Sequence, residues 1–126
     1  MSRQTQAIIH ADALLHNFKA LAAIAPSSQS MAVVKADAYG HGAVNVARIL
    51  QHVSSQFAVA IIEEAIALRD AGISAPVVVL EGAHQAKECQ MAFQHNCILV
   101  MHCEEQLQWL NNCPENQRPH IWLKVD

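Results

Sequence analysis

The sequence predicts an α/β fold made of parallel strand–helix units, and three observations support this prediction. Short apolar runs rich in β-branched residues recur 20 to 26 residues apart, and a segment with helical periodicity follows each of the first four. The runs are apolar without strict alternation, which is typical of strands covered on both faces in a parallel sheet. Hydrophobic residues make up 52% of the 126 residues and charged residues 15%, so a packed core is expected. The runs begin near Met31, Phe57, Val77, Ile98 and His120.

The first predicted element is an amphipathic helix near residues 12–25. Its apolar residues recur at the three- and four-residue spacing of one helix face. Asp12 is suited to be its N-cap, because a carboxylate can accept hydrogen bonds from the N–H groups of the first turn. The apolar positions are Leu14, Leu15, Phe18, Leu21, Ala22 and Ala25.

Strand–helix units follow this helix. The first strand, 31–34, ends at Lys35 and is followed by a polar turn, after which a helix begins beyond Gly42. The second strand, 57–62, precedes a helix that ends at Gly72, a residue suited to a left-handed C-terminal cap. Further strands are predicted at 77–80, 98–101 and 121–125, with the helices between them ending at Asn96 and Pro114.

Five parallel strands fit two architectures. An open doubly wound sheet would be complete at this length. A TIM-type (β/α)8 barrel needs eight units and typically about 250 residues, so this chain would be only part of one. Composition and spacing do not distinguish the two architectures.

Charge and composition exclude several classes of partner. The formal net charge is −3 and the chain has no basic run, so nucleic acid is not an expected partner. No apolar stretch is long enough to span a membrane. The polar start, residues 1–6, has no signal-type apolar region behind it, and we therefore expect a cytoplasmic protein. Four irregularly spaced cysteines predict reduced, buried thiols and no metal site; they are Cys89, Cys97, Cys103 and Cys113.

The most informative stretch is residues 33–42, Val-Val-Lys-Ala-Asp-Ala-Tyr-Gly-His-Gly. Lys35 stands at the mouth of an apolar strand, partly out of water. Desolvation favours the neutral amine, which can form a Schiff base with an aldehyde. An ordinary solvated strand end is the alternative interpretation of such a lysine.

This stretch closely resembles the lysine motif of alanine racemases, and the resemblance covers almost the whole chain. Members of that family fold as a (β/α)8 barrel followed by a β-rich domain and work as homodimers. The resemblance implies that residues 1–126 are roughly the first half of the barrel that binds pyridoxal 5′-phosphate (PLP), with the rest of the barrel and the C-terminal β domain absent. The other matching segments are 12–17, 57–65, 68–73, 76–82 and 122–126.

The resemblance assigns three residues of this chain. Lys35 matches the lysine that carries PLP and serves as one of two catalytic bases. Tyr39 matches a tyrosine whose hydroxyl helps to hold the cofactor phosphate. Lys124 matches a lysine that is carbamylated in many members, where the resulting anion positions an arginine near the PLP ring.

The activity implied by the resemblance is the interconversion of L- and D-alanine, for peptidoglycan synthesis or for alanine breakdown. The family's second base is a tyrosine from the other subunit, but Tyr39 is the single tyrosine here and already has a different match. We therefore expect the 126 residues alone to be inactive. Two alternatives stay open: a non-catalytic PLP-binding or self-associating half-barrel, and a racemase of broader substrate range.

Other residues of these loops have simpler interpretations. Gly40 and Gly42 resemble a phosphate cradle, but they equally serve to free the turn after Lys35. For His41, between the two glycines, a structural hydrogen bond is favoured over acid–base catalysis. Glu63 and Glu64 would lie at the mouth of a barrel, yet acidic residues also suit the first turn of a helix, which is the preferred interpretation.

Overall fold

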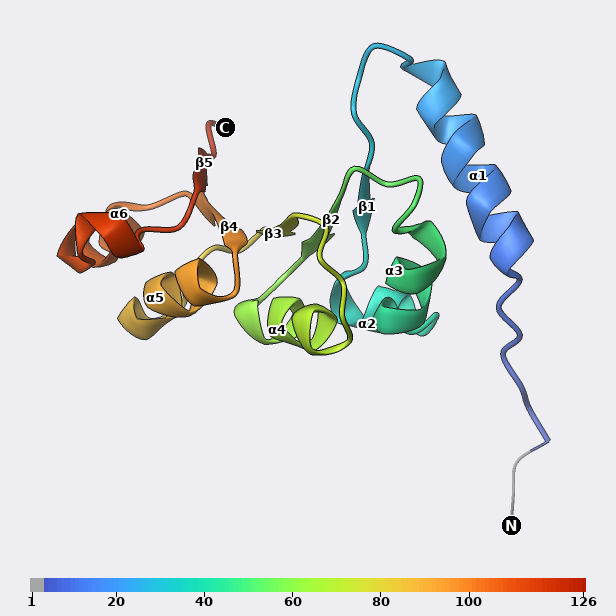
Figure 1. Cartoon of the computed structure of the whole chain (residues 1–126), viewed down its shortest axis with the longest axis horizontal. Helices are drawn as coiled ribbons and strands as arrows, with labels where there is room; N and C mark the ends of the chain where they lie inside the picture. The colour runs from blue at the N-terminus through green and yellow to red at the C-terminus, as the bar shows by residue number, and fades with distance from the viewer. Residues whose placement is uncertain (1–3) are drawn as a thin grey trace.

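A computed structural model of the chain describes residues 4–126; residues 1–3 of the polar start lie outside the described part. It confirms the α/β prediction: strands and helices alternate along the chain (Figure 1). The elements are α1 (Ala11–Ile24), β1 (Met31–Val33), α2 (Lys35–Tyr39), α3 (Ala43–Leu50), β2 (Gln56–Val59), α4 (Ile62–Asp70), β3 (Val77–Val79), α5 (Ala86–Gln94), β4 (Cys97–Met101), α6 (Glu104–Asn112), the 3₁₀ helix η1 (Glu115–Gln117) and β5 (Ile121–Leu123).

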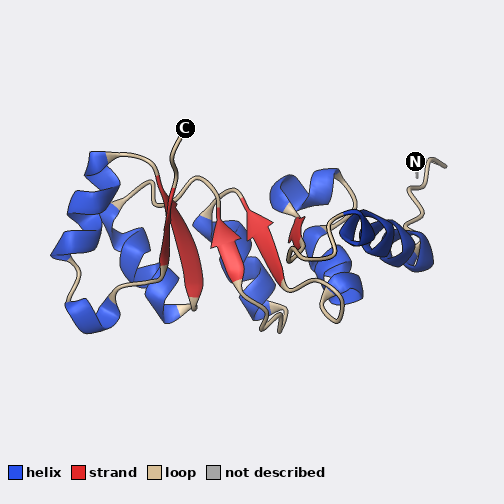
Figure 2. Cartoon of the chain, turned by 90° about the horizontal axis from the view of Figure 1, so that it is seen from above, coloured by secondary structure: helices blue, strands red, loops and turns tan. Residues whose placement is uncertain are grey.

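All strands are parallel and follow the order β1-β2-β3-β4-β5, so each strand lies beside the one before it in sequence. A doubly wound sheet reverses its winding direction at one point. This sheet does not reverse, which excludes that alternative. The winding is that of a barrel wall, and Figure 2 shows the strands side by side with helices around them.

The two faces of the sheet are packed differently. Because successive side chains of a strand point to opposite faces, Phe57, Val77 and Leu99 pack into one buried cluster together with helix residues such as Ile62 and Leu68. The helices α3 to α6 follow one another along this side of the sheet (Figure 1).

The other face is built from strand residues. Ala58, Val78 and Val100 form its buried cluster, against which Met31, Leu80 and Ile98 pack. Within residues 4–126, no helix residue joins this cluster. Both faces thus carry apolar side chains, which explains why the strand runs lack strict alternation.

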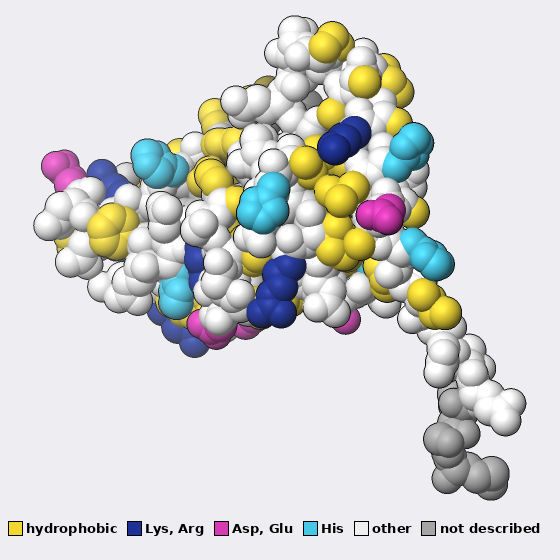
Figure 3. Space-filling view, turned by 45° about the vertical axis from the view of Figure 1, so that its right-hand side comes forward, with side chains coloured by type: hydrophobic (Ala, Val, Ile, Leu, Met, Phe, Trp, Pro, Cys, Tyr) yellow, Lys and Arg dark blue, Asp and Glu magenta, His cyan; other side chains and the backbone are white. Residues whose placement is uncertain are grey.

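The α1 helix lies at the β1 end of the sheet and contacts α3. Not one of its residues is fully buried, and Figure 3 shows hydrophobic side chains at the surface of this end of the molecule. The predicted N-cap is wrong: α1 begins at Ala11 with His10 at the cap position, and Asp12 lies within the first turn. None of the described helices is long and apolar enough to cross a membrane.

Turn residues confirm two of the predicted helix ends. Gly72 and Asn96 both have positive φ after α4 and α5. Four of the five strands end earlier than predicted, at Val33, Val59, Val79 and Leu123. The difference is largest for β2, because Ile62 faces the core from the first residue of α4.

Two further findings were not expected from the sequence. The guanidinium of Arg69 donates hydrogen bonds to the carbonyl oxygens of Ile73, Ala75, His95 and Asn96 and so joins the end of α4 to the loop before β4. All four cysteines are free, but the prediction that they are buried is right only for Cys89 and Cys97, since Cys103 is exposed and Cys113 is half-buried.

Candidate active site

The carboxyl ends of parallel strands meet at one edge of the sheet, and this edge is where barrel enzymes place their reacting groups. The loop after β1 carries Lys35 and Tyr39, and the residues after β5 include Lys124. The structure therefore places the three predicted residues at the carboxyl ends of the strands. Lys35 and Tyr39 follow the first strand of the sheet, whereas Lys124 follows the last.

The turn after Lys35 is the short segment labelled α2, and its backbone is left-handed. Ala36, Asp37, Ala38 and Tyr39 all have φ between 50° and 53°. Left-handed helical geometry costs roughly 1 to 2 kcal/mol for each residue with a Cβ atom. The four residues together therefore store on the order of 4 to 8 kcal/mol, which other contacts must offset.

Hydrogen bonds within the loop supply part of this compensation. The Asp37 carboxylate accepts a hydrogen bond from the N–H of Ala43 at 2.8 Å, at the start of α3. Its main-chain carbonyl accepts from the N–H groups of Gly40 at 3.1 Å and Gly42 at 3.0 Å. His41 Nδ1 lies 3.0 Å from the carbonyl oxygen of Ala38, the structural role expected for this histidine.

Glu64 supplies a contact from another element. Its Oε1 accepts a hydrogen bond from the N–H of Ala36 at 2.6 Å. Its Oε2 accepts from the N–H groups of Ala60 at 2.7 Å and Ile61 at 3.3 Å, immediately before α4. One carboxylate thus ties the turn after Lys35 to the end of β2. Glu64 does lie in the first turn of α4, as predicted, but the link to β1 was missed.

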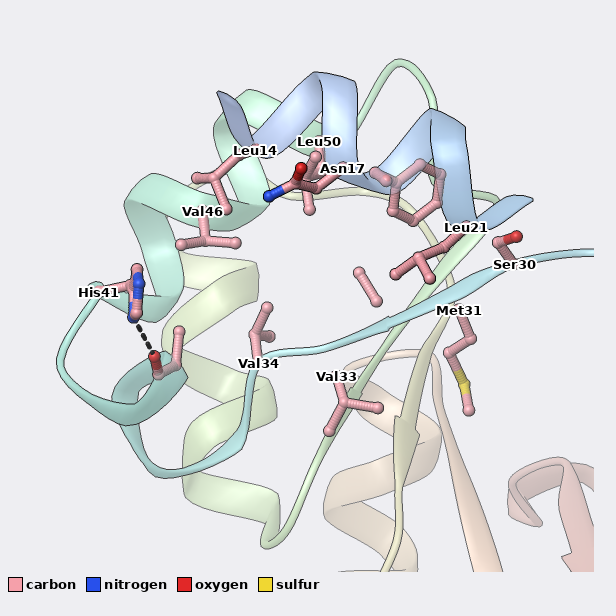
Figure 4. A pocket seen from close by; sticks show the side chains of 13 residues that line it. Leu14, Asn17, Leu21, Ser30, Met31, Val33, Val34, His41, Val46 and Leu50 are labelled. Carbon is pink, nitrogen blue, oxygen red and sulfur yellow. Dashed lines mark hydrogen bonds between the residues drawn. The ribbon is translucent and has the colours of Figure 1, made fainter. Parts of the chain in front are cut away.

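Lys35 is half-buried and Tyr39 is 73% exposed. Just before them, Val34 is buried and Val33 is half exposed, and Figure 4 shows the two valines pointing to opposite sides of β1. Among residues 4–126, no carboxylate lies within ion-pair distance of the Lys35 amine. Lys35 is therefore partly exposed and Tyr39 largely exposed just beyond the carboxyl end of β1.

Lys124 continues the sheet beyond β5, since its N–H donates to the carbonyl of Met101 at 2.8 Å. Its amine is 3.6 Å from a carboxylate oxygen of Asp126 and about half exposed. Four strand spacings of about 4.8 Å each separate β1 from β5 along the sheet. The described residues therefore do not bring Lys124 together with Lys35 and Tyr39.

A groove of about 540 Å³ lies between α1 and β1 (Figure 4). Its walls are mainly apolar, from residues such as Leu14, Phe18 and Val46, and Lys35 and Tyr39 are not among its lining residues. The groove therefore borders the turn after Lys35 through Ala38 and His41, but the two predicted site residues themselves do not line it.

Comparison with known proteins decides the family. Residues 9–126 match the family described as "Alanine racemase, N-terminal domain". The chain belongs to this family. An alanine racemase from Marinobacter nauticus is 45% identical over all 126 residues, which cover 34% of its length. A catabolic alanine racemase from Pseudomonas putida is 44% identical over 124 residues, again 34% of its length.

A solved structure agrees. The biosynthetic alanine racemase of Pseudomonas aeruginosa superposes with a TM-score of 0.85 at 38% identity, over 90% of this chain and 32% of that one. The chain thus spans about a third of the length of the racemases it matches. Its sheet order corresponds to the beginning of the racemase barrel.

The alanine racemase family is PLP-dependent, and the residues at the lysine site fit this cofactor. PLP requires a primary amine for its aldehyde, which Lys35 offers without a competing ion pair in residues 4–126. The accessible hydroxyl of Tyr39 can donate a hydrogen bond to a phosphate oxygen. Both groups lie on one turn whose backbone is held by Glu64 and Asp37.

A second cluster of polar residues lies at the carboxyl ends of the strands, in the segments that follow β3 and β4. The carbonyl oxygen of Glu81 accepts a hydrogen bond from Gln106 Nε2 at 3.0 Å and lies 3.1 Å from His102 Nε2. The carboxylate of Glu81 pairs with His84 at 2.9 Å. In the described part of the chain, no three His, Cys, Asp or Glu side chains are grouped so as to hold a metal ion.

Proposed function

We propose that residues 1–126 form the PLP-binding first half of the barrel of an alanine racemase, and that Lys35 is its cofactor lysine. The observation that supports this most strongly is the position of Lys35, a partly exposed lysine just beyond the carboxyl end of β1, within a chain of this family. Bound PLP would supply an aldehyde that condenses with amines and a ring that takes up electrons when an α-proton leaves.

Each residue of this chain then has a defined task. The Lys35 amine holds the cofactor, and when it is released as a neutral amine it accepts or returns the proton at the α-carbon of alanine. The Tyr39 hydroxyl donates to the cofactor phosphate. Lys124, when carbamylated, presents an anion in place of a cation and positions an arginine from the rest of the enzyme.

The complete enzyme would interconvert L- and D-alanine in the cytoplasm, as a homodimer, either to supply D-alanine for peptidoglycan or to break alanine down. Two-base racemisation needs a second base on the other side of the α-carbon. Tyr39 is the chain's single tyrosine and is assigned to the phosphate, so that base must come from outside these 126 residues. The 126 residues alone are therefore proposed to bind cofactor without racemising alanine.

A chimera tests this proposal. Residues 1–126 replace the matching third of the Marinobacter nauticus racemase, and the conversion of L- to D-alanine is followed by chiral chromatography. We expect activity from the chimera and a loss on the order of 10³-fold or more after Lys35→Ala. The control is Lys87→Ala, an exposed lysine on α5, which should leave the rate unchanged. An active chimera that tolerates Lys35→Ala would refute the proposal.

A further inference from the structure

The carboxylate of Glu64 is the only side-chain group within residues 4–126 that hydrogen-bonds both to the turn after Lys35 and to the end of β2. Its two oxygens accept three backbone N–H groups, from Ala36, Ala60 and Ile61. Neighbouring Glu63 lies in the same helical turn, but it is exposed and makes no side-chain hydrogen bond in the described residues. The two acidic residues therefore have different tasks.

Helix capping accounts for the position of Oε2, which lies beside the N–H groups of the two residues that precede α4. Ile61 precedes α4, and a glutamate three residues later commonly accepts a hydrogen bond from the N–H of the cap residue. The Oε1 contact has no such explanation, because Ala36 is 28 residues earlier in the chain and belongs to a different strand–helix unit. At 2.6 Å it is also the shortest of the three contacts.

The N–H of Ala36 has a direct geometric relation to Lys35. It belongs to the peptide unit that begins at the Lys35 carbonyl, and a peptide unit is planar. Fixing this N–H therefore fixes the orientation of the peptide plane next to the Cα of Lys35, and with it the direction in which the lysine side chain leaves the backbone. Since Ala36 starts the left-handed turn, release of this contact frees the first residue of a strained segment.

We propose that Glu64 is a positioning residue for Lys35: its carboxylate accepts a hydrogen bond from the Ala36 N–H and so orients the lysine side chain at the carboxyl end of β1. The proposal rests on the proposed function of Lys35. Glu64 does not touch the reacting atoms, and its effect passes through the backbone of the turn.

Two substitutions separate positioning from capping. Glu64→Gln keeps the shape but has one acceptor oxygen and one NH₂ group, which cannot accept from a backbone N–H. Its oxygen is expected at the position of Oε2, where two N–H groups donate, so that the NH₂ group faces the N–H of Ala36 and that contact is lost. Glu64→Asp keeps the charge but is one methylene shorter, so it can still cap α4 and cannot reach Ala36. Glu63→Gln is the matched control, since it removes the same charge from the same helical turn.

The first readout is hydrogen exchange of the Ala36 amide in the 126-residue chain, with amides of β3 as an internal measure of folding. We expect the Ala36 amide to exchange at least tenfold faster in both Glu64 variants and at the wild-type rate in Glu63→Gln. The β3 amides should be unchanged in all three. Uniform loss of protection in β3 as well would give Glu64 a purely structural role and overturn the proposal, as would wild-type exchange at Ala36.

The second readout is the reactivity of the Lys35 amine toward acetic anhydride, measured residue by residue with mass spectrometry. Its rate should change at least threefold in the Glu64 variants, whereas Lys19 and Lys87 keep theirs. An unchanged Lys35 rate would overturn the proposal. Neither readout uses PLP. Failure of wild-type Lys35 to take up PLP would therefore refute the proposed function separately, while a wild-type rate of PLP uptake in both Glu64 variants would refute only the positioning role.

Discussion

Replacing Gly82 by alanine tests how tightly the residues at the carboxyl ends of the strands are packed. Gly82 follows β3 with φ of +70°, a conformation that L side chains rarely adopt. A Cβ atom there would overlap with the carbonyl oxygen of Val100 and lie 2.6 Å from Nε2 of Gln106. Neither neighbour is free to move, because Val100 belongs to β4 and Gln106 Nε2 donates to the carbonyls of Glu81 and Ala83, each at 3.0 Å.

The expected loss of stability has two sources. The left-handed conformation costs an alanine about 1 to 2 kcal/mol. Forcing a methyl group into a filled site typically costs about 1 to 3 kcal/mol more. We therefore expect Gly82→Ala to lower the free energy of unfolding by about 2 to 5 kcal/mol, a large part of the 5 to 15 kcal/mol typical of a folded domain.

Gly72→Ala is the matched control, since Gly72 has φ of +85° but no atom within 4 Å of the Cβ position. It should lose only the conformational part, about 1 to 2 kcal/mol. Urea unfolding of both variants at one protein concentration measures the difference. Equal losses for Gly72→Ala and Gly82→Ala would refute the claim that the residues around Gly82 are closely packed.

Three further predictions concern the rest of the chain. Burial, with a smaller effect of neighbouring Cys113, raises the pKa of the Cys89 thiol from 9.0 to about 11. Because the folded state favours the protonated thiol, the contribution of Cys89 to the free energy of unfolding is complete below pH 9 and is lost as the pH rises through 11. If the free energy of unfolding depended on pH in the same way in the wild type and in Cys89→Ala, the result would contradict this prediction. Because Val33 is 51% and Leu123 73% exposed on the edge strands, sedimentation of the 126-residue chain should show self-association, and a sharp 13.8-kDa monomer boundary would count against it. Arg69→Lys keeps the charge but cannot reach four carbonyls at once, so we expect a loss of about 2 kcal/mol or more in urea unfolding, and a loss under 0.5 kcal/mol would show that these contacts are not important.

The order of strands and helices could be predicted because it depends on local patterns. Apolar β-branched runs mark the strands, and Gly72 ends α4 with the positive φ that its lack of a side chain permits. Element ends were less certain where one pattern runs into the next. The apolar run from Phe57 continues through Ile62, although the strand stops at Val59, because a buried side chain at the start of a helix looks the same in sequence as one in a strand.

The geometry of the lysine turn could not be predicted in this way. Alanine, aspartate and tyrosine all prefer right-handed conformations, so nothing local to residues 36–39 signals a left-handed turn except the following Gly40. The turn is held by Asp37 and by Glu64, and the Glu64 contact depends on the fold bringing β1 and β2 together. The sequence placed Glu64 in the first turn of a helix, but it did not indicate which backbone groups the two carboxylate oxygens bind.

The most direct test of the account is the site of PLP attachment. The 126-residue chain is incubated with PLP and treated with borohydride, which fixes a condensed pyridoxyl group as a stable secondary amine. Intact mass and peptide mapping then locate the adduct among the four lysines, Lys19, Lys35, Lys87 and Lys124. The account predicts one pyridoxyl group per chain, on Lys35, and none in Lys35→Arg. Absence of an adduct, or labelling spread evenly over the four lysines, would contradict it.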